Sequence, residues 1–205
     1  MENSVSARLE KVAEAEFPTR FGRFRIYGFR IYAAGHPEEA VVLVHGELAG
    51  DPPPLVRIHS QCLTGDVFHS LRCDCRSQLE MALEKIVDEE RGLLIYEHKE
   101  GRGIGLLNKL RAYELQDHGA DTVEANERLG FAPDLRDYSL PGEILRYFGL
   151  TRVRLFSNNP EKVQAVERAG VIVTERLPCV APPEEFTEAY LRTKKEKLGH
   201  LLDPV

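Results

Sequence analysis

The residues most able to carry chemistry are three cysteines that lie close together in the sequence: Cys62, Cys73 and Cys75. Thiolates are good zinc ligands. A structural zinc ion usually has four protein ligands, whereas a catalytic one has three and a water molecule. The spacing therefore indicates a metal site. It leaves open a catalytic zinc site, three unliganded thiols, or a structural zinc site completed by His59 or His69.

A glycine-rich turn at Glu100–Gly105 separates an apolar strand-like run, residues 92–98, from a helical pattern at 106–118. Glycines let the backbone approach a ligand, and a helix N-terminus favours anions. Arg102 adds a fork of donors that suits phosphate. The glycine spacing does not match the dinucleotide-binding fingerprint. The turn is thus either an anion site or an ordinary strand-to-helix connection.

A second candidate anion site begins at Ser157, after the strand-like run 152–157. Asn159 is suited to cap a helix and Pro160 to occupy its first position. Ser157 and Lys162 would then both face an anion at the helix start. The alternative is a capped surface helix with Lys162 in solvent.

Polar residues crowd the segment 122–138, which we interpret as a loop that a scaffold holds in place. Asp134 is a candidate general base, and Arg136 a candidate partner for phosphate charge. Salt bridges on the surface are the alternative interpretation.

The elements that must position these residues are predicted from hydrophobic periodicity. Strands are expected at 22–34, 40–48, 55–60, 92–98, 152–157 and 171–177, and helices at 78–91, 106–118, 141–149, from 160, and 187–201. Strands alternate with helices over most of the chain. We therefore expect one α/β domain over residues 1–205, a three-layer α/β/α fold with a mixed sheet, and a flexible N-terminus at about 1–7.

Composition restricts the partners. The formal net charge of -6 disfavours broad nucleic-acid binding, which needs a basic surface. No apolar run approaches the roughly 20 residues of a membrane span, and residues 1–16 lack the basic and apolar regions of a secretory signal, so we expect a cytoplasmic protein without a membrane partner. The alternative of a zinc-stabilised binding module predicts basic or aromatic residues around the cysteines. Arg72 and Arg76 are offset there by Asp66, Asp74 and Glu80.

Taken together, four stretches resemble the GTP cyclohydrolase II family: VRIHSQCLTGDVFHSLRCDCRSQLE, EGRGIGLLNKLRAYELQDHGADTVEAN, LGFAPDLRDY and SNNPEKVQAVERAGVIVTER. The resemblance spans about residues 8–202. It implies a zinc-dependent enzyme that opens the guanine ring of GTP at C8 and releases formate and pyrophosphate, the first step of riboflavin biosynthesis. It also implies a homodimer, with Mg²⁺ accompanying the triphosphate.

The resemblance assigns roles by position. It implies one zinc ion per chain, held by Cys62, Cys73 and Cys75 plus water. Asp134 and Arg136 are implied in catalysis, with Tyr113 near the opening ring. Arg136 is either the nucleophile of the family proposal or, because a guanidinium only donates, an electrostatic stabiliser. The implied GTP contacts are Arg57, Ile58, His59, Ser60, Gln61, Gln78, Glu100, Gly101, Arg102, Thr122, Ser157 and Lys162.

Three positions depart from the family pattern: Arg76 for glycine, Gln61 for glutamate, and Ser157 for threonine. Arg76 would be strained if its φ angle were positive. The chain is too short for the N-terminal dihydroxybutanone phosphate synthase half of the two-domain relatives, so we expect a monofunctional enzyme. A related enzyme that opens the ring but retains formate is the nearest alternative, whereas the zinc deaminase signatures are absent.

Overall fold

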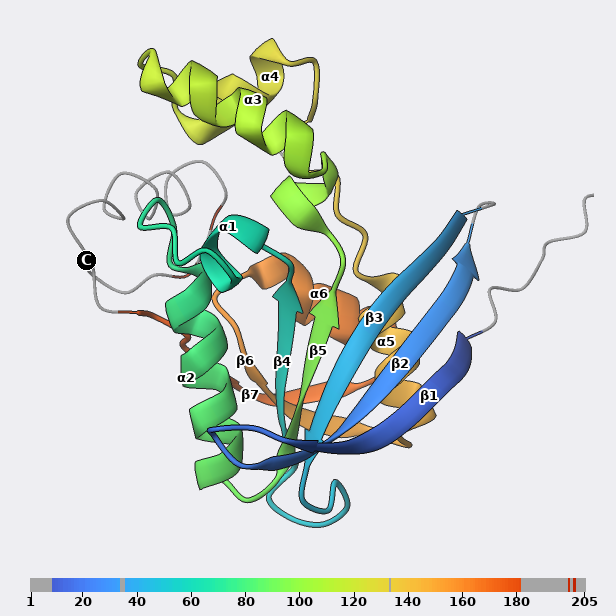
Figure 1. The fold of residues 1–205 in the computed structure, drawn as a ribbon. Helices are drawn as coiled ribbons and strands as arrows, with labels where there is room; N and C mark the ends of the chain where they lie inside the picture. Colours follow the sequence, from blue (N-terminus) through green and yellow to red (C-terminus); the bar gives the residue numbers. More distant parts are fainter. Residues whose placement is uncertain (1–8, 34–35, 133, 182–198, 200, 202–205) are drawn as a thin grey trace, which may run out of the picture.

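The computed structural model describes residues 9–33, 36–132, 134–181, 199 and 201. Within these ranges seven strands form one sheet in the order β1-β2-β3-β5-β4-β6-β7 (Figure 1). Strands β1 to β3 and β5 pair in antiparallel fashion, and β5, β4, β6 and β7 pair in parallel. This confirms the predicted mixed sheet. The strands are β1 (Leu9–Pro18), β2 (Arg23–Ala33), β3 (His36–His45), β4 (Leu55–Ser60), β5 (Gly92–Glu97), β6 (Arg152–Phe156) and β7 (Ile172–Leu177).

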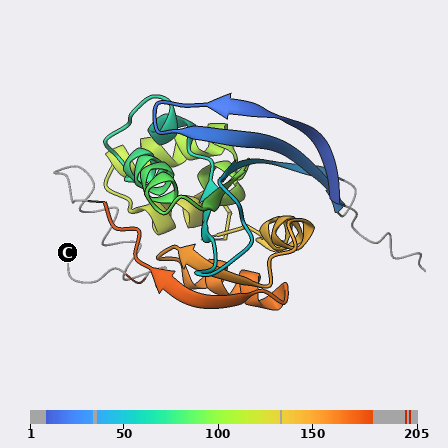
Figure 2. The same cartoon turned by 90° about the horizontal axis from the view of Figure 1, so that it is seen from below.

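Helices cover both faces of the sheet, which confirms the three-layer α/β/α prediction. Adjacent side chains on a strand point to opposite faces. Val56 accordingly packs in one cluster with α5 (Ser139–Tyr147) and α6 (Pro160–Arg168), whereas Leu55 packs in another with α2 (Cys75–Asp88). Figure 2 shows the strong twist of the sheet, which places its edges β1 and β7 on opposite sides of the molecule.

Four further elements lie at the carboxyl ends of the parallel strands β4 and β5. They are α1 (Leu63–Asp66) after β4, and the 3₁₀ turn η1 (Glu100–Gly103), α3 (Leu106–Asp117) and α4 (Thr122–Arg128) after β5. Helices α3 and α4 pack on each other through small residues, Ala112, Ala120 and Ala125, and lie together beyond the end of the sheet (Figure 1). Ligands of parallel α/β sheets bind at this end of the strands.

Two sequence interpretations in the segment after α3 are wrong. Residues 122–128 form helix α4 rather than loop. Its N-cap Asp121 accepts hydrogen bonds from the backbone of Val123 and Glu124, and the Glu124 side chain returns a bond to Asp121, a capping box. Helix α5 begins at Ser139, so Pro141 is its third residue rather than its first.

Most other boundaries agree to within one or two residues, but β3 begins four residues before and ends three residues before the predicted strand, and α2 is shifted three residues toward the N-terminus at both ends. Strand β1 was not predicted. The proposed flexible N-terminus at 1–7 and nearly all of the predicted helix at 187–201 lie outside the described residues. Among the described helices, none combines the length and apolar character that a membrane span requires.

Candidate active site and metal centre

The three clustered cysteines converge although they come from two elements. Cys62 follows β4, and Cys73 and Cys75 lie at the start of α2. Their sulfur atoms all lie within 4.8 Å of one another, and those of Cys62 and Cys73 are 3.6 Å apart. Sulfurs bound tetrahedrally at about 2.3 Å from zinc would be roughly 3.8 Å apart. The three thiols therefore fit a zinc ion.

Gly65 makes room for this convergence. A Cβ atom at this position would lie 2.8 Å from the Cys73 sulfur and 3.2 Å from that of Cys62. Among the described residues, no histidine joins the three thiols. His69 is exposed, and His59 bonds a carboxylate instead. The structure thus favours three protein ligands, which leaves a coordination position for water.

The crowded thiols hydrogen bond one another and do not titrate alike. Bonds from Cys73 and Cys75 lower the pKa of Cys62, an effect that nearby Lys109 reinforces. The same contact with Cys62 raises the pKa of Cys73 to about 11. A thiolate at Cys62 is the form that binds metal.

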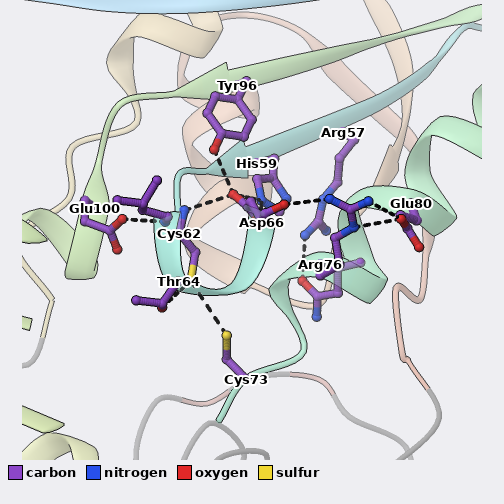
Figure 3. A network of polar contacts seen from close by, with 12 residues as sticks. Arg57, His59, Cys62, Thr64, Asp66, Cys73, Arg76, Glu80, Tyr96 and Glu100 are labelled. Atoms are coloured by element: carbon purple, nitrogen blue, oxygen red, sulfur yellow. Dashed lines mark hydrogen bonds and ion pairs between the residues drawn. The ribbon is translucent and has the colours of Figure 1, made fainter. Parts of the chain in front are cut away.

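Asp66 holds the cysteine turn to the sheet (Figure 3). Its buried carboxylate accepts hydrogen bonds from the Cys62 backbone N–H at 2.9 Å, the Tyr96 hydroxyl at 2.8 Å and His59 Nε2 at 3.1 Å. Since a carboxylate only accepts, Nε2 carries the His59 proton, and burial lowers the pKa of His59. His59 Nδ1 is left as a buried acceptor without a partner among the described residues.

Arg76 reinforces the same turn. Its guanidinium donates to the Asp66 carbonyl at 2.6 Å and to the Glu80 carboxylate at 2.7 Å (Figure 3). Arg76 lies in the first turn of α2 and is not among the described residues with positive φ. The strain considered for this departure from the family pattern therefore does not arise.

One pocket brings the metal centre together with most of the predicted substrate contacts. The predicted residues that line it are Arg57, His59, Ser60, Gln61, Gln78, Glu100, Gly101, Arg102, Tyr113, Thr122, Arg136, Ser157 and Lys162, together with the three cysteines. Two predicted residues do not line it. Ile58 is fully buried in the core on the other face of β4, and Asp134 is bonded to Arg136, which does line the pocket.

Buried cations form one wall of the pocket. Arg57 donates to the Phe156 carbonyl at 3.0 Å and to Gln78 Oε1 at 2.7 Å. Lys162 donates to the Ile58 carbonyl at 2.8 Å, so Lys162 is not the solvated lysine of the alternative interpretation. Burial, together with Arg57 and Arg136, lowers the pKa of Lys162. The helix start is as predicted, because Asn159 caps α6 and Pro160 is its first residue.

Arg102 has the most unusual conformation in the pocket. Both Gly101 and Arg102 have a φ of 60°, a left-handed conformation that is unfavourable for a residue with a Cβ. Both terminal nitrogens of Arg102 are buried and have no hydrogen-bond partner among the described residues. A strained, unpartnered guanidinium in a pocket indicates a ligand that would bind it.

Asp134 and Arg136 form a bidentate ion pair. Nε of Arg136 contacts Asp134 Oδ1 at 2.9 Å, and Nη2 contacts Oδ2. Although burial opposes ionisation, this contact lowers the pKa of Asp134. The cationic groups of Lys162 and Arg136 both lie within 5.4 Å of the centre of the Tyr138 ring. The Asp134–Arg136 ion pair is therefore close to Lys162.

Tyr113 and Lys109 reach the metal centre from α3. The Tyr113 hydroxyl lies 3.1 Å from Thr64 Oγ1, and the Arg72 guanidinium carbon lies 4.9 Å from the centre of the Tyr113 ring. Burial raises the pKa of Tyr113. Sequence reasoning missed Lys109 and Arg72, which also line the pocket. The spacing of Lys109 and Tyr113 by four residues was an available signal, because it places them on one helix face.

Most of the chain matches a known enzyme family. The family model of GTP cyclohydrolase II matches residues 10–178. GTP cyclohydrolase-2 proteins of Escherichia coli, from strains HS (O9:H4) and K12/DH10B, are 52% identical over 196 residues, covering 96% of this chain and 99% of each relative. A solved two-domain 3,4-dihydroxy-2-butanone 4-phosphate synthase from A. baumannii aligns with 85% of this chain at 18% identity and a TM-score of 0.47, and the chain spans 40% of its length. On the family match and the identity to these relatives, the chain belongs to the GTP cyclohydrolase II family.

Proposed function

We propose that this enzyme hydrolyses GTP in the first step of riboflavin biosynthesis, with release of formate and pyrophosphate. The remaining product would be 2,5-diamino-6-hydroxy-4-(5-phosphoribosylamino)pyrimidine. The observation that carries the proposal is that one pocket contains both a three-thiol metal centre and a strained arginine without a partner. The first suits hydrolysis of a purine ring, and the second suits a polyphosphate.

We propose one zinc ion per chain, held by Cys62, Cys73 and Cys75. Zinc bound there would act as a Lewis acid that activates water for hydrolysis at guanine C8. The site residues are suited to this, because three ligands leave a position open and the cysteine turn is held by Asp66.

The cations would bind the triphosphate. Arg102 offers its two free terminal nitrogens, and charge-assisted bonds from arginine to phosphate are strong and directional. Lys162 and Ser157 would contribute from the start of α6, where the helix end also favours an anion. Mg²⁺ would accompany the phosphates, since this cation prefers oxygen ligands.

Arg136 would stabilise charge at the α-phosphate rather than attack it. The Asp134 carboxylate accepts from Arg136 Nε and Nη2, which fixes the orientation of the guanidinium. A guanidinium presents only donors and is therefore a poor nucleophile. The lowered pKa keeps Asp134 ionised at neutral pH, so it could accept a proton but has none to donate. An Arg136→Lys enzyme that keeps a substantial fraction of pyrophosphate release would support this role, and a covalent guanylyl adduct on Arg136 would refute it.

Tyr113 would position or protonate the opening ring. Its raised pKa keeps the phenol protonated at neutral pH, and its contact with Thr64 places the hydroxyl beside the cysteine turn. His59 would offer Nδ1 as a hydrogen-bond acceptor to the substrate, because Asp66 fixes its tautomer.

The deciding experiment incubates zinc-loaded protein with GTP and Mg²⁺ and measures formate and pyrophosphate together. Both products should appear and be lost in Cys73→Ser. The matched control is Cys179→Ser, which removes a thiol outside the cluster and should keep activity. If zinc is bound but neither product forms, the proposed function is wrong. Ring opening with pyrophosphate but without formate would instead identify the enzyme that retains formate.

A homodimer is also part of the proposal. Exposed apolar side chains on α3 and after α1, such as Leu107 at 74% and Phe68 at 70% exposure, are suited to an interface. Light scattering during size-exclusion chromatography would measure the mass. The free thiols of the metal centre suit a reducing compartment such as the cytoplasm, which is where we propose the enzyme works.

A further inference from the structure

Lys109 contacts the metal centre directly, although no role in the proposed reaction accounts for it. It lies one turn into α3, and its ammonium nitrogen is 3.0 Å from the Cys62 sulfur. The same nitrogen is 2.7 Å from Glu100 Oε1. The side chain of Lys109 is only 12% exposed. A lysine buried to this extent, with two acceptors, is held in one position rather than free in solvent.

Glu100 fixes where the ammonium group stands. Its Oε2 accepts from the Leu63 backbone N–H at 2.6 Å, and its Oε1 accepts from the Gly101 N–H at 3.0 Å as well as from Lys109. Leu63 directly follows Cys62 in the chain. Glu100 therefore ties together the cysteine turn, the glycine-rich turn and α3, and holds Lys109 at a set distance from the sulfur.

We propose that Lys109 is a positioning residue of the metal centre, which donates a hydrogen bond to the Cys62 sulfur and places a positive charge beside the three thiolates. Three thiolates around a divalent cation leave a net negative charge in a partly buried site. Such a charge is costly without a nearby cation and donor.

This inference rests on the proposed metal-dependent function. It also implies that α3, which carries Tyr113, is anchored to the metal centre. Tyr113 lies four residues after Lys109 and therefore on the same helix face. The bond from Lys109 to Cys62 would thus fix the position of α3, and with it Tyr113, relative to the bound metal. The competing reading is that Lys109, which lines the pocket, binds only the substrate.

The test compares Lys109→Met, Lys109→Arg and a matched control, Arg111→Met, which removes a positive charge from the same helix outside the pocket. Zinc affinity is measured by competition with a chromophoric chelator. Cobalt(II) is then substituted to record the thiolate-to-metal charge-transfer band. In Lys109→Met the zinc affinity should fall by about 10- to 100-fold, as for other groups that support metal ligands. The band should move to lower energy, since the sulfur loses a hydrogen bond.

Arg111→Met should match the wild type, and Lys109→Arg should recover most of the affinity because it retains charge and donors. The inference is overturned if Lys109→Met binds zinc as tightly as the wild type with an unchanged cobalt band, in particular if only the KM for GTP rises. If Lys109→Met does not fold, Lys109→Gln, which removes the positive charge, takes its place, and a zinc affinity and cobalt band identical to those of the wild type overturn the inference. Failure of the wild type to take up zinc would refute the proposed metal-dependent function itself.

Discussion

Replacing Arg102 by glycine should make the enzyme more stable and yet impair GTP binding. A left-handed backbone costs a residue with a Cβ about 1–2 kcal/mol, and Arg102 has a φ of 60°. Glycine removes this strain but loses about 0.5–1 kcal/mol more conformational entropy on folding. The substitution also removes two buried nitrogens that have no protein partner. We expect a net gain of about 1 kcal/mol, or about 2–4 °C in Tm for a chain of this size.

The loss in binding should be larger than the gain in stability. A hydrogen bond to a charged group contributes about 1.5–3 kcal/mol, which corresponds to roughly a 10- to 100-fold weaker affinity for GTP. Thermal unfolding would be followed with and without GTP, and KM measured from formate release. Without GTP the variant should melt above the wild type, and GTP should raise its Tm less.

Glu90→Gly is the matched control, because Glu90 also has a positive φ, 54°, but lies in the turn after α2 and outside the pocket. It should show the gain in stability with an unchanged KM. The reasoning is refuted if Arg102→Gly melts below the wild type while Glu90→Gly melts above it. It is refuted equally if Arg102→Gly binds GTP with wild-type affinity.

Three further expectations concern the metal centre and pH. Gly65→Ala should abolish stoichiometric zinc binding, measured by metal analysis, because its Cβ would lie 2.8 Å from the Cys73 sulfur. Removing zinc with a chelator should lower Tm reversibly, since a ligand that binds only the folded state stabilises it. Arg154 lowers the pKa of Glu89 in the folded state, so this pair stabilises the protein above the unfolded pKa and its contribution is lost as the pH falls through the folded pKa. Glu89→Gln should therefore lower urea stability by about 0.5–1 kcal/mol at pH 7 and by less near pH 3.

The strands around the pocket were predictable because each is an apolar run between turn residues. The prediction for β4, Leu55–Ser60, agrees at both ends, and those for β5 and β6 agree to within one residue. Strand β1 was not predicted, because nine of its ten residues are exposed and its small and charged residues do not produce a clear apolar face. Pairing with β2, a tertiary interaction, decides its conformation.

The candidate site was predictable in composition but not in arrangement. Spacing alone brought Cys73 and Cys75 together with Cys62, yet left the number of ligands open. The choice between three and four depended on where His59 points, and Asp66, seven residues later, determines that. Nor does the sequence reveal that Ile58 faces the core while its carbonyl accepts the Lys162 bond. Such contacts depend on the register and twist of the sheet, which local sequence does not encode.

The pocket concentrates features that oppose folding of the ligand-free protein. Arg102 is strained and unpartnered, Lys162 is buried with its pKa lowered by burial and by neighbouring cations, and His59 Nδ1 lacks a donor. Each feature is unfavourable alone, and each would be relieved by one ligand that is polyanionic at one end and carries hydrogen-bond donors elsewhere. Strain of this kind persists where the surrounding fold over-determines it. Here the Leu135 N–H donates to the Arg102 carbonyl, and Glu100 accepts from the Leu63 N–H and from Lys109. The chemistry of these groups thus indicates which ligand would bind here. A nucleoside triphosphate fits, because its phosphates are polyanionic and its base carries hydrogen-bond donors.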